Sequence, residues 1–256
     1  NWLFLLRRCG PPGRNEREKE LKMRRRSPLR SSTALIVGLL LLVATNSTIA
    51  QSTGGEAETW FTAGGTVGYN TGLQVLAFGR AGDFAEGLPV DFQLGIGYTS
   101  SDAGDPAMAR RVFINNATNG IPRESGHSWD FTLDALIPVN LLDLPRSYVT
   151  TGFRHSRYTA NFAYIGGNED FDIVSRHWGL GAGLGSDFAV SRRMDLTFNL
   201  GLDYYFSSTL TGHDTAYSPD GSAVNPREDY EYGDADAAVG QPKFRPRLAT
   251  GLQYRF

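Results

Sequence analysis

The stretch MDLTFNLGLDYYF, residues 194–206, alternates apolar and polar side chains along nearly its whole length. A period of two predicts a β-strand whose two faces meet different environments. Three further stretches follow the same rule: PVDFQLGIGY (89–98), SWDFTLDALI (128–137) and HWGLGAGLGSDF (177–188). A tilted strand of about 9 to 11 residues is long enough to cross a membrane, and these stretches meet that requirement.

Three weaker segments and a strictly alternating C-terminal segment bring the expected number of strands to eight. GLQVLAFGR (72–80) has no clear phase, and SYVTTGFRHSRYTANFAY (147–164) changes phase near Arg154 to Arg157, where we expect a β-bulge. The other two are TWFTAGGTVGY (59–69) and the C-terminal segment 243–256, which ends in LATGLQYRF.

The connections between these strands alternate in length. Long polar loops are expected near 100–126 and 209–242, after the third and seventh strands. Short connections at 140–146 and 190–193 follow the fourth and sixth strands, and the first link, near 69–72, is also short. This alternation indicates an up-and-down order of strands.

The polar faces of these strands combine glycine with charges of both signs. Glycine weakens a water-exposed strand, whereas the interior of a narrow barrel needs small residues beside large polar ones. Buried charges persist only when they are paired, and the Arg fork suits carboxylates. We therefore expect a polar lumen network of Asp91, Asp130, Asp134, Asp195, Asp203, Arg245, Arg247 and Arg255, with Asp187 on the same face.

Aromatic residues lie near the expected strand ends, as in the girdles of membrane barrels. They are Trp60, Tyr69, Tyr98, Trp129, Tyr148, Tyr164, Trp178, Phe206, Tyr254 and Phe256. The sequence thus predicts an all-β fold, an eight-stranded antiparallel up-and-down transmembrane β-barrel over residues 58–256. A soluble barrel or sandwich would turn the apolar faces inward and leave the charged faces in water.

A targeting segment is expected ahead of the barrel. The basic stretch MRRRSPLR (23–30), the apolar run ALIVGLLLLVA (34–44) and the small residues before Gln51 predict a signal peptide over 23–50, with a linker at 51–57. The apolar run is shorter than the roughly 20 residues of a transmembrane helix, which disfavours a single-span anchor. We expect residues 1–22, which contain no Met, to be upstream translated or miscalled sequence.

The charge of the chain changes once this leader is set aside. Ten of the 25 Lys and Arg and three of the 27 Asp and Glu precede Gln51, which leaves 15 basic and 24 acidic side chains. An acidic chain of this kind argues against nucleic-acid binding. The one cysteine, Cys9, also lies in the leader, so we expect no thiol nucleophile in the mature chain. No catalytic, cofactor-binding or metal-ligating set is expected.

The signal peptide, the eight alternating strands, the connections and the terminal LQYRF together resemble the small bacterial outer-membrane barrels of the OmpA-membrane-domain and OmpX type. The resemblance implies a porin-like barrel in the outer membrane of a Gram-negative cell, in contact with outer-membrane lipids. It also implies that the barrel-assembly machinery reads an insertion signal on the last strand. The positions of that signal here are Leu248, Gly251, Leu252, Tyr254 and Phe256.

A packed lumen disfavours free diffusion of solutes, so we expect a structural or surface-interaction protein. An acidic loop such as 209–242 is more often simply solvated, and the alternative is that it binds cations or a basic partner. A narrow channel or small-ligand transport barrel is the alternative. A lipid A-modifying enzyme is less favoured: neighbours such as His155 and Ser156, or His127 and Ser128, point to opposite faces of a strand. By resemblance, a deacylase would use a His and a Ser two residues apart, and we expect no such pair.

Overall fold

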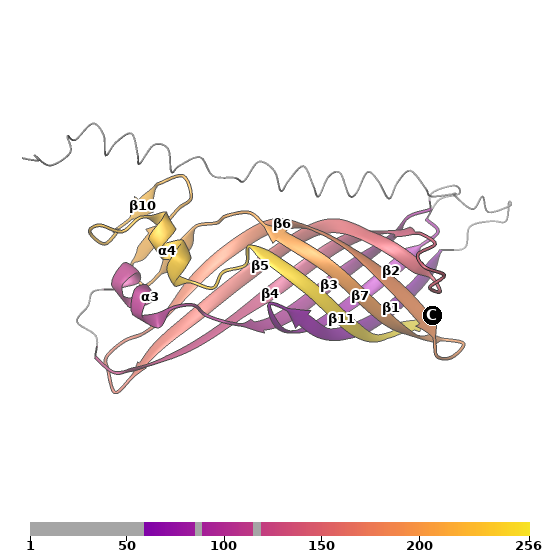
Figure 1. Ribbon diagram of the computed structural model, residues 1–256, viewed down its shortest axis with the longest axis horizontal. Coiled ribbons are helices and arrows are strands. Elements are labelled where there is room, and N and C mark those ends of the chain that lie inside the picture. The colour runs from indigo at the N-terminus through magenta and orange to yellow at the C-terminus, as the bar shows by residue number, and fades with distance from the viewer. Residues whose placement is uncertain (1–58, 85–88, 115–118) are drawn as a thin grey trace, which may run out of the picture. The chain divides into compact units, whose positions relative to one another are not determined.

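The computed structural model describes residues 59–84, 89–114 and 119–256, and the predicted signal peptide, upstream segment and linker lie outside these ranges. Its wall consists of long antiparallel strands (Figure 1). They are β1 (Trp60–Asn70), β2 (Gly72–Gly82), β3 (Asp91–Ser101), β4 (Ile121–Pro138), β5 (Ser147–Ile165), β6 (Asp170–Ala189), β7 (Met194–Tyr205) and β11 (Phe244–Arg255). Each pairs with its neighbour in sequence, and β11 pairs with both β7 and β1. The closed sheet confirms the predicted eight-stranded antiparallel barrel.

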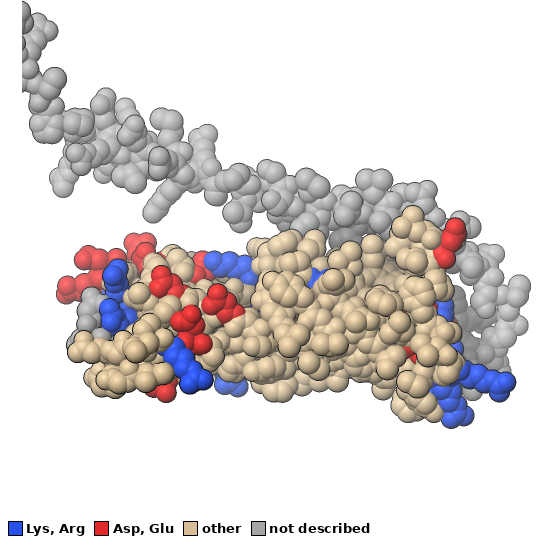
Figure 2. All heavy atoms as spheres, turned by 60° about the horizontal axis from the view of Figure 1, so that its bottom comes forward, with Lys and Arg blue, Asp and Glu red and all other residues tan. Residues whose placement is uncertain are grey.

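The two faces of the wall differ in the way that the alternation predicts. On β7, Asp195, Thr197 and Asp203 point inward and are at most 3% exposed, whereas Phe198 and Leu200 point outward and are 44% and 59% exposed. On the face that Figure 2 shows, the middle of the barrel carries few charged groups, and Lys, Arg, Asp and Glu gather toward the two ends. Such a wall suits contact with lipid.

The strands differ in length, which corrects the expected connections. β4, β5 and β6 have 18, 19 and 20 residues, whereas β1, β2 and β3 have 11 each. Because β4 begins at Ile121, the first long connection ends before residue 126, and β5 is joined to β6 by the short link 166–169. At the end of the barrel where β4 begins, the connections at 71 and 166–169 are therefore short, and those at 102–120 and 206–243 are long.

The predicted β-bulge near Arg154 to Arg157 was wrong. The register of β5 with β4 and with β6 runs without interruption through this region, where Arg154 lies opposite Gly179 and Arg157 opposite Arg176. Even-numbered residues of β5 point inward throughout. What changes after Ser156 is the chemistry of the inner face, which turns from polar to apolar at Tyr158.

The parts of β5 and β6 that extend beyond the polar lumen belong to a second hydrophobic unit, which we call the cap. Its other elements are α3 (Pro106–Phe113), α4 (Tyr232–Ala238), β8 (Leu210–Gly212), β9 (Thr215–Tyr217) and β10 (Ala223–Val224). They lie at the end of the barrel opposite the C-terminus (Figure 1). Among the residues with defined structure, no α-helix is both long and apolar enough to cross a membrane.

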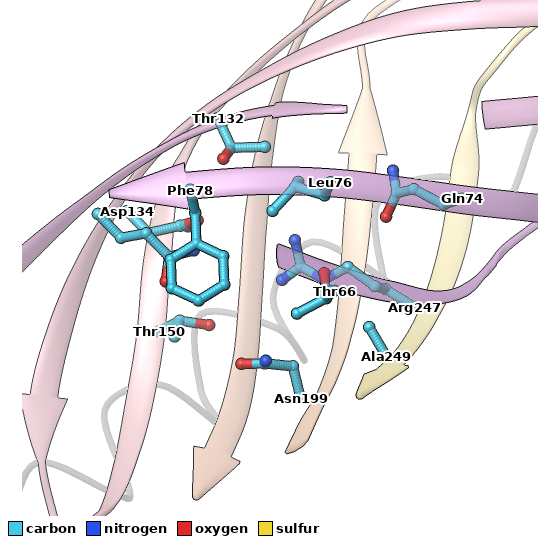
Figure 3. A pocket seen from close by; sticks show the side chains of 11 residues that line it. Thr66, Gln74, Leu76, Phe78, Thr132, Asp134, Thr150, Asn199, Arg247 and Ala249 are labelled. Atoms are coloured by element: carbon cyan, nitrogen blue, oxygen red, sulfur yellow. The ribbon is translucent and has the colours of Figure 1, made fainter. Parts of the chain in front are cut away.

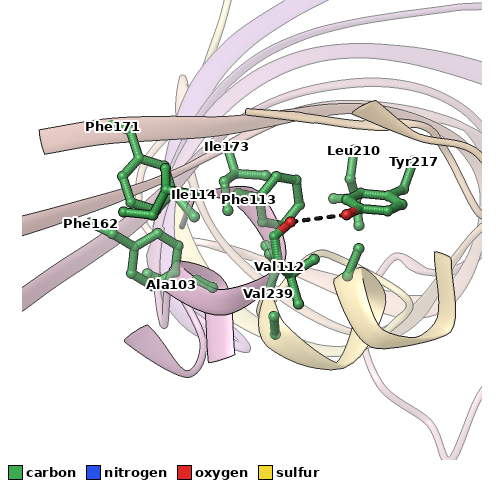
Figure 4. Close-up of a cluster of buried hydrophobic side chains, with 14 of the residues drawn as sticks. Ala103, Val112, Phe113, Ile114, Phe162, Phe171, Ile173, Leu210, Tyr217 and Val239 are labelled. Atoms are coloured by element: carbon green, nitrogen blue, oxygen red, sulfur yellow. Dashed lines mark hydrogen bonds between the residues drawn. The ribbon is translucent and has the colours of Figure 1, made fainter. Parts of the chain in front are cut away.

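The cap has a closely packed apolar core (Figure 4). Phe113 of α3 is fully buried and meets the ring of Tyr217 edge to face, with 5.6 Å between the ring centroids. The Tyr217 hydroxyl donates to the carbonyl of Val112 at 2.9 Å. Asp105 caps the start of α3 because its carboxylate accepts from the amides of Ala107 and Met108. The predicted loop 209–242 is therefore largely structured.

Candidate functional site

The centre of the lumen is occupied by one arginine between two aspartates. Arg154 of β5 donates from Nη1 to Asp134 Oδ1 of β4 and from Nε to Asp203 Oδ1 of β7, each at 2.8 Å. All three side chains are at most 2% exposed. Because β4 and β7 are not neighbours in the barrel, this guanidinium connects two separate parts of the wall across the lumen.

Glycines on the inner face make room for these large groups. A Cβ atom at Gly181 would overlap the Arg154 guanidinium, and one at Gly201 would lie 2.9 Å from Arg247 Nη2. A real side chain at either position would force the arginine to move. The glycine content of the polar faces therefore has a steric cause in the packing of the lumen.

Nearer the cap, Asp130 is the centre of a second set of hydrogen bonds. Its carboxylate accepts from Thr99 Oγ1 at 2.7 Å and from Ser156 Oγ at 2.6 Å, and Arg245 Nη1 lies 3.5 Å away. Arg245 also lies over the Tyr205 ring, 5.6 Å from its centroid. Asp130 and Arg245 are both 1% exposed, so this pair fills the lumen at its level, as Arg154 and its two aspartates do at the centre.

Toward the C-terminal end of the barrel, Arg80 forms a third set. Its Nη1 donates to Asp187 at 2.7 Å, its Nε to Gln93 at 2.7 Å and its Nη2 to the Tyr148 hydroxyl at 2.6 Å. Asp187 also accepts from Gln253 at 3.0 Å. All three nitrogens of the guanidinium thus help to hold β2 against β3, β5 and β6.

At the rim, Asp195 collects two arginines from different segments. Arg146 donates to both of its carboxylate oxygens, at 2.6 Å and 3.0 Å, and Arg255 donates at 2.9 Å. Both arginines are about two-fifths exposed, whereas Asp195 is buried. Screening by solvent makes these rim pairs weaker than those of the lumen.

The structure places the residues of the expected lumen network in four situations. Asp130, Asp134, Asp195, Asp203 and Arg245 are buried on the inner face. Arg247 is partly buried, with Nη1 3.6 Å from Asp203, and Arg255 pairs at the rim. Asp91 is half-buried at the start of β3 and forms no ion pair with any residue of the described ranges.

Sequence reasoning missed Arg80, Arg146 and Arg154, which hold the main ion pairs of the lumen and rim. Two of them lie in segments whose phase was unclear or misread. A signal was nevertheless present, because the expected polar faces carried six aspartates against three arginines. Buried carboxylates need partners, so an excess of three predicts further arginines on strands whose orientation is not yet assigned.

Two aromatic residues expected in the interfacial girdles face inward instead. Tyr148 is 6% exposed and belongs to the Arg80 set, while Tyr164 is 5% exposed in the cap core, where its hydroxyl donates to the carbonyl of Pro106. By contrast, Trp129 and Trp178 are 47% and 64% exposed on the outer face.

The lumen contains a small cavity beside Arg247 (Figure 3). Its volume of about 20 Å³ is lined by Thr66, Gln74 and Thr132, among others. About 10–15 Å³ is enough for one water molecule, and Thr132 Oγ1 and Arg247 Nε have no protein partner within the described residues. The cavity therefore suits a bound water and is too small for a solute.

The candidate catalytic pairs are separated by the wall. Ser156 points inward to Asp130, whereas His155 points outward and lies 4.5 Å from Trp178, between ring centroids. Likewise, His127 packs on Tyr98 at 5.7 Å, while Ser128 is buried inside. Neither serine has its neighbouring histidine as a base.

The expectation that no His and Ser lie two residues apart was wrong. Ser175 and His177 both face inward on β6, with Oγ 2.7 Å from Nε2, and Nδ1 lies 2.9 Å from the carbonyl of Phe206. The serine hydroxyl can donate to the histidine, whose other nitrogen then donates to the carbonyl. Because the two residues are 2% and 1% exposed, a substrate has no approach to them, and the pair serves to satisfy buried polar groups.

The positions of the expected assembly signal lie on the strand that closes the barrel. Leu248, Leu252, Tyr254 and Phe256 are exposed on the outer face, by 39% to 78%, and Gly251 lies on the inner face. Tyr254 and Phe256 meet edge to face at 5.4 Å. That the assembly machinery reads these residues stays a prediction.

A closed barrel with an apolar outer wall, aromatic side chains toward its ends and a lumen filled by paired charges defines a small transmembrane β-barrel of the outer-membrane type. The crystal structure of a major outer membrane protein from Thermus thermophilus shares this fold, with a TM-score of 0.62 and 24% sequence identity over 77% of this chain and 99% of that one. The chain therefore has the fold of the small outer-membrane β-barrels, as the resemblance in sequence implied.

Two other solved barrels are similar at lower scores. CarO from Acinetobacter baumannii has a TM-score of 0.40 and 15% identity over 79% of this chain and 100% of its own. Neisserial surface protein A has a TM-score of 0.34 and 13% identity over 77% of this chain and 97% of its own. No protein-family model and no curated protein sequence matches the chain.

Proposed function

We propose that this protein is a closed outer-membrane barrel with a structural and surface-interaction role, exported through the predicted signal peptide. The proposal is supported by the observation that the barrel is closed twice, in its lumen and at one end. Ion pairs fill the lumen at the level of Arg154, and the cap packs an apolar core over the outer end. A closed barrel with a rigid outer unit is suited to contacts at the cell surface and not to transport.

Planar-bilayer recordings test this closure. The wild-type protein should give no stepwise current, because the cavity beside Arg247 admits only water. Arg247→Ala enlarges that cavity and is the control that can admit ions. Heat-dependent migration of the same samples on gels verifies that folded barrel was inserted. Stepwise current in the wild type, raised further by Arg247→Ala, would support the alternative of a narrow channel.

The acidic side of the cap is where we place the partner. Acidic side chains gather at this end of the molecule (Figure 2). Some of these carboxylates already form ion pairs within the protein: Asp214 pairs with Arg227 at 2.8 Å and Asp236 with Lys243 at 2.6 Å. The hydrogen bond from His213, together with Arg227, holds the pKa of Asp214 below its ordinary value.

A basic partner fits this surface better than a metal ion. Nowhere in the described ranges do three or more His, Cys, Asp or Glu side chains come close enough to hold one. Glu228 and Asp229 form no ion pair with other described residues, so their charges are free for a partner. We therefore propose a cationic polypeptide as the ligand and leave bound cations as the weaker alternative.

Binding to immobilised polylysine tests the partner. Glu228→Gln/Asp229→Asn should weaken binding about threefold at low salt, since exposed charge pairs contribute roughly 0.2–1 kcal/mol each. The matched control, Asp83→Asn/Asp143→Asn, removes the same charge from exposed positions at the opposite rim and should leave binding unchanged. Equal losses in both variants would show that net charge, and not the cap, attracts the polycation.

A further inference from the structure

Two arginines lie side by side on the outer face of the barrel. Arg157 of β5 and Arg176 of β6 are direct cross-strand partners, and both side chains are exposed. Like charges directly opposite each other destabilise a sheet. Within the described residues, neither guanidinium is used in an ion pair, in contrast to the arginines of the lumen.

On the outer faces of β4, β5 and β6, no carboxylate lies beside this pair. The next acidic group outward on the same face of β6 is Asp172, four positions from Arg176, which corresponds to about 13 Å along a strand. Asp172 accepts instead from Asn161 Nδ2 at 2.9 Å. Exposed charges at this separation are largely screened, because the Debye length is about 10 Å at 0.1 M salt.

The pair lies at one edge of the apolar wall. Trp178, Leu180, Leu184 and Phe188 form the lipid-facing side of β6. With a rise of about 3.3 Å per residue and a tilt of about 40°, Trp178 lies about 25 Å above Phe188 along the barrel axis. This height matches the apolar band of an outer-membrane barrel, and Arg176 is the next outward-facing residue beyond it.

Aromatic side chains flank the two arginines on the membrane side. Trp129 of β4 is the cross-strand partner of Arg157, and Trp178 follows Arg176 on the same face. Tryptophan favours the level of the lipid headgroups. The arginines therefore lie at the level of the lipid headgroups on the side of the membrane that carries the cap, which is the outer leaflet in the proposed orientation of the barrel.

We propose that Arg157 and Arg176 form a binding site for a phosphate group of an outer-leaflet lipid, whose acyl chains pack along Trp129 and Trp178. Guanidinium groups bind phosphate through paired, charge-assisted hydrogen bonds. A phosphate between the two arginines also removes the repulsion that the bare pair carries. The inference rests on the proposed location of the barrel in the outer membrane.

Native mass spectrometry of the full barrel in detergent tests the site, with bis-phosphorylated lipid A as the probe. Because both arginines would contribute to binding an anionic lipid, Arg157→Gln/Arg176→Gln should weaken retention of the lipid at least about tenfold. Dephosphorylated lipid A should bind the wild type about as weakly as bis-phosphorylated lipid A binds the double variant. Arg192→Gln/Arg193→Gln removes two exposed arginines from the opposite rim and is the matched control, expected to stay within about twofold of the wild type.

The outcomes separate this inference from the proposed function. Unchanged retention in Arg157→Gln/Arg176→Gln overturns the site. Displacement of the lipid by an equal concentration of inorganic phosphate also overturns it, because the ligand would then be a free anion. Outer-membrane fractionation and heat-dependent gel migration of the same variants report on location and folding. A barrel absent from the outer membrane contradicts the proposed function, whatever the lipid measurement shows.

Discussion

Replacing Arg154 with Met is expected to lower the free energy of unfolding by about 3–5 kcal/mol, because two aspartates lose their buried partner. Among the described residues, Asp134 would have no cation left, and Asp203 would keep only the longer contact with Arg247. Met fills part of the space but neutralises neither charge. Urea titration of the refolded barrel, followed by gel migration, measures the change.

A combined variant shows whether charge or packing causes this loss. Arg154→Met/Asp134→Asn/Asp203→Asn removes all three charges and should recover much of the stability, since replacing a buried ion pair as a whole is often close to neutral. Arg192→Met, at an exposed rim position, is the control for the arginine itself. A single variant as stable as that control would contradict the central role of Arg154.

Phe113→Ala is expected to destabilise the cap by about 3–5 kcal/mol while the barrel stays folded. The ring is fully buried and packs against Tyr217, and the cap core lies beyond the polar lumen, although β5 and β6 contribute residues to both. Limited proteolysis should therefore cut within 206–243, while the barrel strands remain protected. Heat-dependent gel migration should match that of the wild type.

The control for this prediction is Ile121→Ala, because that side chain is 73% exposed at the outer start of β4. It should leave the rate of cleavage unchanged. If Phe113→Ala lowers the unfolding midpoint of the barrel as much as that of the cap, the two are one cooperative unit, and the cap is not the separate unit that the core suggests.

The strands were the part of the fold most easily predicted from the sequence. Alternation is a local property, because successive side chains of a strand point to opposite faces whatever the partners are. The stretch 194–206 therefore assigned Asp195 and Asp203 to the same face before any pairing was known. Glycine and charge on that face then indicated which side was the lumen.

Residues in segments with weak alternation could not be assigned in the same way. Phe78 and Leu76 point inward beside Arg80, so apolar residues occur on both faces of β2 and its phase is hidden. On β5, the inner face turns apolar beyond Ser156 and thereby imitates a change of phase. The orientation of both strands followed only from their register with neighbours.

By itself, the sequence of this protein determined that membrane-type strands with an apolar and a polar face would close into a barrel, since these features repeat within a few residues. The tertiary structure alone decided which charges pair and what closes the outer end. Arg80 and Asp187 are 107 residues apart in the chain, and no local pattern connects them. The cap core likewise draws single apolar residues such as Phe113, Phe162 and Leu210 from separate segments. Such residues form a core only when the long strands β5 and β6 bring those segments together.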